Sequence, residues 1–417
     1  MSPFGSNRAL TLVVSAAVAV ASLVFFSITL DLSGDWSGDE AHKVAETYFL
    51  RLALDGDFAH PDWFATPVAR TNPHLGKWIF GLAILAGGEE LPTDPEARWT
   101  GSRFLPPEGR EEQYGRMLKA ARLVSLVSVA AIAGILTWLS LRACGPLAAG
   151  IAIVLLFRHF LTITVARTAI FDALQALVVL VSAIPLWMLW RTRDERLVRS
   201  ITLGALAGIA CAIAFQVRLN GFLALLSAWL IIGAASRLRG VWDTIRLLAV
   251  VTIAFFVGAT ALNPFYWSAP RSGSNIAVTV APDTLLLVRP VHRYAAQYRD
   301  VQAVMASVPE SMRLRGVRAR FVYFGSIAFS GIAGKLIAIG WLTALASVLA
   351  RRDRARLVFG LLWAGTLALA TALWLPLAWE KYVFVTMPGL ILVAAFGWSS
   401  LLSRALATIS GKRRNSL

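Results

Sequence analysis

Apolar residues gather in long runs that are separated by shorter polar and charged segments. Ten runs predict membrane-spanning helices, because about 20 apolar helical residues cross about 30 Å of hydrocarbon. They cover roughly residues 10–30, 119–141, 147–165, 168–190, 200–216, 220–235, 247–263, 333–350, 357–377 and 383–402. The pattern therefore predicts an all-α polytopic membrane protein with about ten transmembrane helices.

The first run has a second interpretation, because Arg8 precedes it as a basic residue precedes the core of a signal peptide. The run is longer than a usual signal-peptide core, and residues 31–33 offer no small-residue cleavage pattern. We therefore expect an uncleaved anchor, followed by a single transmembrane domain over residues 1–417. Its two long connections are residues 31–118 and 264–332, and no outer domain is expected after the last helix.

Basic residues predict the orientation. With both termini in the cytoplasm, the inner segments hold 17 basic and 4 acidic residues, and the rest of the chain holds 23 basic and 20 acidic. This excess agrees with the rule that cytoplasmic segments are positive. We expect a cell-membrane protein with cytoplasmic termini and both long connections on the outer side.

Composition excludes several other classes. Charged residues make up 15% of the chain, well below the roughly 25% of soluble domains. The two cysteines, Cys144 and Cys211, cannot form a disulfide framework and lack metal-ligand spacing. The net charge is +16, and the basic residues lie mostly in the segments between apolar runs, where they indicate membrane orientation. No nucleic-acid partner is therefore expected.

The first long connection carries candidate chemistry. Asp39 and Glu40 begin a predicted helix that continues from 41 to 54 and ends at Asp55-Gly56-Asp57. One interpretation is that the two acids stabilise the first turn through the helix dipole. The other is that a carboxylate at the membrane face acts as a general base or binds a cation.

A second segment, Asn72-Pro73-His74-Leu75-Gly76-Lys77, leads into an apolar stretch that is too short to span a membrane. The stretch predicts an interfacial helix. Lys77 would then lie at the depth of lipid phosphates, either in a phosphate site or as a lysine that extends to the interface.

Charged residues also stand at predicted helix ends. Arg167 precedes Asp172 by five residues, Arg218 lies near Asn220, and Lys381-Tyr382 precedes the last helix. Charges within apolar sequence are costly, so such residues either pair structurally or serve a site. The sequence leaves both interpretations open.

In their order and spacing these motifs resemble the GT-C superfamily of membrane glycosyltransferases. The similar groups are the dolichyl-phosphate-mannose protein mannosyltransferases and the relatives of the bacterial aminoarabinose transferase acting on lipid A. Asn72-Pro73-His74 stands where a His-Pro-Pro motif is commoner. In the second connection, Asn263-Pro264 and His292-Arg293-Tyr294 are similar to bacterial phospholipid-carrier-dependent members.

The resemblance implies transfer of a sugar from a polyprenyl-phosphate donor to an acceptor hydroxyl on the outer face, with inversion at the anomeric carbon. The acceptor would be a lipid, a glycan or a protein. Asp39 would be the base, and Glu40 would orient the acceptor or the sugar. The predicted phosphate-binding residues are Lys77, Arg167, Arg218 and Lys381, and the predicted supporting residues are Asp172, His74, Arg293 and Tyr382.

No cofactor and no metal site are expected, although some relatives with oligosaccharide donors use a metal, so a divalent cation stays an alternative. Two other functions remain open. A multi-pass transporter or lipid flippase predicts polar residues at mid-membrane and broken helices, and a non-catalytic assembly subunit predicts loss of the acidic pair.

Overall fold

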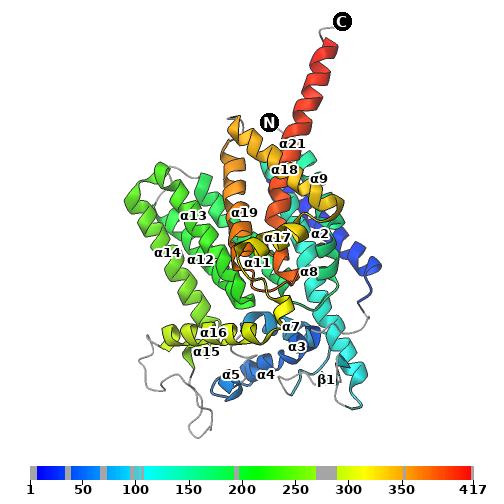
Figure 1. Cartoon of the computed structure of the whole chain (residues 1–417), viewed down its shortest axis with the longest axis vertical. Coiled ribbons are helices and arrows are strands. Elements are labelled where there is room, and N and C mark those ends of the chain that lie inside the picture. The colour runs from blue at the N-terminus through cyan, green and yellow to red at the C-terminus, as the bar shows by residue number, and fades with distance from the viewer. Residues whose placement is uncertain are drawn as a thin grey trace.

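The structure is a computed structural model, and it describes residues 7–32, 39–65, 73–93, 99–100, 103–104, 108–191, 197–268, 289–350 and 354–414. Helices account for nearly all of its regular elements, which form an elongated bundle with smaller helices at one end (Figure 1). The only regular non-helical element in these ranges is the short antiparallel pair β1 (Trp99–Thr100) and β2 (Arg103–Phe104). The prediction of an all-α membrane fold is confirmed.

Each predicted apolar run is helical, and those at 147–165 and 383–402 are each divided between two helices. Eight helices of the described residues are long and apolar enough to cross a membrane, or nine with one bent pair. The eight are α2 (Arg8–Thr29), α8 (Glu111–Ala143), α11 (Asp172–Arg191), α12 (Leu197–Val217), α14 (Val241–Ala261), α18 (Gly331–Leu349), α19 (Arg354–Trp374) and α21 (Met387–Arg414). The short run at 220–235 forms α13 (Phe222–Arg239).

The helix predicted over 147–165 is not continuous. The segment forms α9 (Pro146–Arg158) and α10 (Phe160–Ala166), which are bent by 68°. His159 stands at the break with an extended backbone, and its Nε2 lies 3.2 Å from the carbonyl oxygen of Ala328. A contact with a distant segment therefore accompanies the bend.

Small residues bring the long helices close together. A Cβ atom at Gly208 of α12 would collide with the carbonyl oxygen of Val251 in α14, and one at Gly340 of α18 would collide with Ala394 of α21. Close backbone approach through small residues is typical of helix packing in membranes.

The shorter helices of the first connection gather at one end of the bundle with α15 (Pro264–Trp267) and α16 (Arg289–Ser307), and α2 begins and α21 ends at the other (Figure 1). The first connection contributes α3 (Glu40–Ala45), α4 (Tyr48–Leu54), α5 (Asp62–Ala65) and α7 (His74–Ala86). The later segments also form η2 (Glu310–Met312), α17 (Val317–Ala328), which lies among the long helices, and α20 (Lys381–Phe384). We call the end with the helices of the first connection the loop end. Asn72 lies outside the described residues.

Two elements of the loop end differ from the prediction. The helix expected over 41–54 is divided into α3 and α4 by Glu46 and Thr47. The helix α8 begins at Glu111, two turns before the expected residue 119, and its first turn carries Glu111 and Glu112, which the helix dipole favours. The interfacial position of the short helices stays a prediction.

Candidate active site

Asp39 and Lys381 meet at the loop end. Asp39 lies immediately before α3, and its side chain accepts no capping hydrogen bond from that helix. It forms an ion pair with the ammonium group of Lys381, the first residue of α20. The Asp39 side chain is 39% exposed and that of Lys381 is 17% exposed. The carboxylate therefore faces a cation and keeps contact with solvent.

Lys381 lies in a mostly apolar environment. Its Nζ atom is 4.6 Å from the centre of the Trp379 ring. Burial lowers the pKa of Lys381 to about 8, because a low-dielectric environment disfavours the charged form. The ammonium group is still protonated at neutral pH, and its attraction for an anion is stronger than in water.

Arg218 forms a second ion pair beside the first. It follows the last residue of α12 and pairs with Asp172, the first residue of α11. Its guanidinium carbon lies 4.5 Å from the centre of the Tyr382 ring. Because Tyr382 follows Lys381 in α20, the two ion pairs are neighbours. Four segments thus bring together five of the predicted site residues: Asp39, Lys381, Tyr382, Arg218 and Asp172.

Lys77 is fully buried in α7, so it does not extend to an interface as an exposed lysine would. Its Nζ atom lies 3.8 Å from Oε2 of Glu46 and 4.5 Å from the centre of the Phe49 ring. Burial lowers its pKa to about 7, and Glu46 opposes this shift. Lys77 therefore belongs to an internal charged cluster under the loop end.

Lys43 belongs to the same cluster and was not among the predicted residues. Its Nζ atom donates to Oε1 of Glu46 at 2.8 Å and lies 5.2 Å from the centre of the Phe171 ring. It is also within electrostatic range of Asp172, so it connects the Lys77 cluster with the Arg218 pair. The spacing of Asp39, Lys43 and Glu46 at i, i+4 and i+7 is the helical signal that could have identified it.

Glu40 has a different environment from Asp39. It is fully buried, and its two carboxylate oxygens each accept a hydrogen bond of 2.8 Å from Arg122 of α8. It also accepts one of 2.6 Å from the backbone N–H of Ala169, and Arg122 donates to the carbonyl of Leu32 at 3.0 Å. These contacts join α3, α8 and the turn before α11. Arg122 was missed because it looks like the polar edge of an apolar run.

His74, at the start of α7, lies in an aromatic environment. Its ring centre is 5.0 Å from that of Phe49 and 4.7 Å from that of Trp63. Both ring nitrogens are buried and have no hydrogen-bond partner within the described part of the chain. Burial, with a smaller contribution from the charge of Lys77, lowers the pKa of His74 well below its usual value. His74 is therefore neutral, and its contacts are those of a packing residue.

Arg167 and Arg293 lie in contrasting places. Arg167 directly follows α10, and its exposed side chain forms no ion pair with the described residues. Asp172, its possible partner from the sequence, pairs with Arg218 instead. Arg293 of α16 is buried, donates to the carbonyl of Phe265 and lies 5.0 Å from the centre of the Phe64 ring. Its contacts hold α16 against α15.

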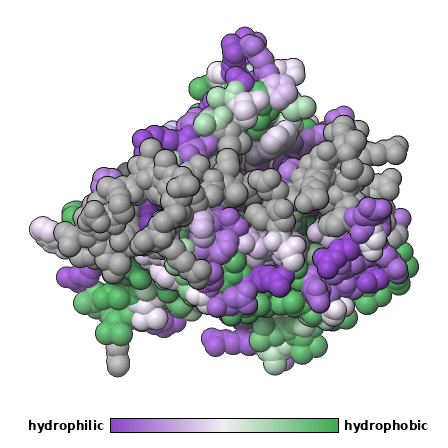
Figure 2. All heavy atoms as spheres, turned by 90° about the horizontal axis from the view of Figure 1, so that it is seen from below, coloured by the Kyte–Doolittle hydropathy of each residue, from purple (hydrophilic) through white to green (hydrophobic). Residues whose placement is uncertain are grey.

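Where described residues are visible at the loop end, polar side chains lie toward the middle and apolar ones are concentrated along the margin (Figure 2). The described residues contain no group of three His, Cys, Asp or Glu side chains placed to hold a metal ion. The chemistry that this end offers is a partly exposed carboxylate among several cations. Such an arrangement can accept a proton from a hydroxyl and stabilise an anionic leaving group.

The sequence matches no known protein-family profile, and no curated protein matches it. Solved structures do match. One is ArnT from Cupriavidus metallidurans bound to undecaprenyl phosphate, with 15% identity and a TM-score of 0.57, covering 97% of this chain and 64% of that one. Another is the archaeal oligosaccharyltransferase AglB from Archaeoglobus fulgidus in complex with an inhibitory peptide and a dolichol-phosphate. Its identity is 12% and its TM-score is 0.51, and the match covers 96% of this chain and 51% of that one.

The oligosaccharyltransferase from Archaeoglobus fulgidus in complex with Zn and sulfate also matches, with 11% identity and a TM-score of 0.52 over 95% of this chain and 49% of that one. These proteins are GT-C glycosyltransferases, and at these identities the likeness establishes the fold. The chain has the GT-C fold, and it spans about 64% of the length of the aminoarabinose transferase.

Proposed function

We propose that the protein is a glycosyltransferase that moves a sugar from a polyprenyl-phosphate donor to an acceptor hydroxyl, with inversion at the anomeric carbon. The observation that carries the proposal is the Asp39–Lys381 ion pair, with Arg218 beside it, at the loop end of a GT-C fold. The bound undecaprenyl phosphate of ArnT and the dolichol-phosphate of AglB support a lipid-phosphate donor.

Asp39 is the proposed base. As the acceptor oxygen attacks the anomeric carbon, the carboxylate accepts the hydroxyl proton, and the bond between that carbon and the phosphate oxygen breaks. The electron pair of the broken bond leaves with the polyprenyl phosphate, so no separate strong acid is required. A positioned base of this kind contributes about 10²–10⁴-fold to the rate.

Lys381 and Arg218 are the proposed cations for the departing phosphate. Lys381 neutralises Asp39 in the resting protein. When a donor phosphate binds to Lys381, the ammonium group has two anions to share, and the Asp39 carboxylate is freed to accept a proton. Donor binding would thereby activate the base. Arg167, whose exposed side chain is unpaired among the described residues, would complete the phosphate site.

Buried charged residues next to this site hold its side chains in position. The salt bridge between Glu40 and Arg122 fixes the start of α3, and hence the position of Asp39. The cluster of Lys43, Glu46 and Lys77 keeps positive charge near Asp172. We propose that the loop end lies on the outer side of the cell membrane and that both termini are cytoplasmic, because the basic residues favour that orientation.

The test uses the full chain in lipid nanodiscs with undecaprenyl-phosphate hexose and pentose donors and a membrane extract as acceptor. Mass spectrometry follows the loss of donor and the release of undecaprenyl phosphate. We expect one donor to be consumed by the wild-type chain and not by D39N. Movement of intact donor across a liposome bilayer without release of undecaprenyl phosphate would support a transporter instead.

A further inference from the structure

A cavity of about 510 Å³ lies at the end of the bundle opposite the loop end. The helix α11 shows the separation, because it begins with Asp172 in the candidate site and ends with Arg191 in the cavity wall. At 1.5 Å per residue the two positions are about 28 Å apart. The cavity is bordered by arginines of five helices: Arg8 of α2, Arg142 of α8, Arg191 of α11, Arg199 of α12 and Arg356 of α19.

The wall of this cavity is rich in positively charged side chains. Within the described ranges, no carboxylate forms an ion pair with Arg8, Arg142, Arg191 or Arg356. The guanidinium of Arg356 donates to the carbonyl of Ala143, and that of Arg191 lies 5.7 Å from the centre of a tryptophan ring. Several guanidinium groups around one cavity favour an anion with several acceptor oxygens, as in a phosphate.

The rest of the wall is apolar. The side chains of Leu139, Trp187, Phe359 and Phe396 line the cavity between the arginines. A small inorganic anion would use the arginines and leave these side chains uncovered. A ligand with both a phosphate and a hydrocarbon part would satisfy both kinds of surface.

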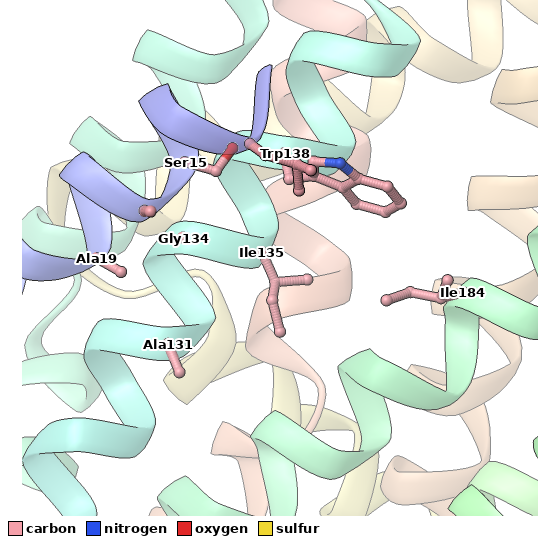
Figure 3. Close-up of a pocket in the computed structure, with 9 residues that line it drawn as sticks. Ser15, Ala19, Ala131, Gly134, Ile135, Trp138 and Ile184 are labelled. Carbon is pink, nitrogen blue, oxygen red and sulfur yellow. The ribbon is translucent and has the colours of Figure 1, made fainter. Parts of the chain in front are cut away.

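An apolar groove of about 430 Å³ continues from the cavity. The two spaces share Leu12 and Trp138 as wall residues. The groove passes between α2, α8 and α11, where Ala131, Ile135 and Ile184 line it (Figure 3). Ala19 and Gly134 allow α2 to approach α8 closely, since a Cβ on Gly134 would lie 2.9 Å from that of Ala19.

We propose that this cavity and groove bind an anionic glycerophospholipid. Its phosphate would lie among the arginines and one acyl chain would lie in the groove. Basic pockets between transmembrane helices are suited to anionic headgroups. The site goes beyond the proposed sugar transfer and does not depend on it, because it uses none of the residues at the loop end.

The test is native mass spectrometry of the full chain in detergent, with phosphatidylglycerol and phosphatidylcholine of identical acyl chains as probes. We expect the wild-type chain to retain phosphatidylglycerol at least about tenfold more strongly. The variant R142Q/R191Q should lose this preference. The control R246Q removes an arginine at the same end that pairs with Asp243 instead of lining the cavity, and it should keep the preference. If the double variant does not fold, R191Q alone should reduce the preference at least about threefold.

A second variant tests the groove. A131L places a larger side chain in it and should weaken phosphatidylglycerol binding, while D39N should leave binding unchanged. The proposal is overturned if phosphatidylcholine binds equally well, or if R191Q and A131L both retain the wild-type preference. It is also overturned if millimolar inorganic phosphate displaces the lipid as effectively from A131L as from the wild type, because the site would then recognise a free anion.

Discussion

Lys381 forms an ion pair with Asp39, which joins the first segment of the loop end to the last. Lys381 belongs to α20, directly before the final long helix, and Asp39 directly precedes the first short helix. The pair places a partly exposed carboxylate next to a lysine of lowered pKa. In the proposed reaction Asp39 accepts the proton of the acceptor hydroxyl, and Lys381 binds the phosphate of the donor.

The pKa of Lys381 predicts a pH dependence of donor binding. With a pKa of about 8, Lys381 is protonated at pH 7 and loses its proton as the pH rises through 8. Above that pH, the Lys381 amine must take up a proton before it can form an ion pair with a donor phosphate. We expect the affinity for undecaprenyl phosphate to fall by up to about tenfold per pH unit between pH 8 and pH 10.

Isothermal titration or fluorescence quenching at a series of pH values measures this affinity. The variant K381R keeps its positive charge over the whole range, so its affinity should change little between pH 7 and pH 10. A wild-type profile that is flat, or that K381R reproduces, would remove Lys381 from the phosphate site.

Glu40 and Arg122 predict a stability effect. Their side chains are 0% and 5% exposed and form a bidentate pair. Replacing Arg122 with Met removes the ion-pair partner of the buried Glu40 carboxylate. We expect R122M to destabilise the protein by about 3–5 kcal/mol, because an uncompensated buried charge is costly.

The double variant E40Q/R122M removes the stranded charge and should recover part of the lost stability. Thermal unfolding in detergent, followed for the two single variants and the double variant, gives the coupling between the residues. Additive effects would show that the pair does not act as a unit.

Arg167 predicts an effect on binding without one on stability. Its side chain is exposed and forms no ion pair with the described residues, so R167A should leave the unfolding temperature unchanged. If it contacts the donor phosphate, its loss should weaken undecaprenyl phosphate binding about tenfold, or about 1.4 kcal/mol. R51A, at an exposed arginine of α4, is the matched control. Equal affinities of R167A and R51A would exclude that contact.

Much of the fold could be predicted because long apolar runs leave few alternatives. Every predicted span is helical, since a helix satisfies its own backbone in lipid, and eight or nine of the ten are long and apolar enough to cross a membrane. The bend at His159 could not be predicted, because no proline or glycine marks it and the contact of His159 is with Ala328, in a distant segment. The division of residues 41–54 at Glu46 was also missed, because both halves keep the apolar spacing of one helix.

The sequence identified the residues of the candidate site more readily than the ion pairs that they form. Asp172 was expected near Arg167, its neighbour in sequence, but it pairs with Arg218. Such a choice depends on how helices pack, which the order of residues does not reveal. Glu40 and Asp39 are adjacent in the sequence, yet one is buried against Arg122 and the other faces Lys381.

The most direct test of the account is the rate of sugar transfer by D39N, compared with D55N, which changes an exposed aspartate of the same connection. Both are measured in nanodiscs with the donor that the wild-type chain consumes, together with the affinity for undecaprenyl phosphate. The account predicts that D39N loses about 10²–10⁴-fold in rate. The variant should bind undecaprenyl phosphate at least as tightly as D55N does, because Lys381 is released from its ion pair with Asp39. Transfer by D39N at the rate of D55N would contradict it.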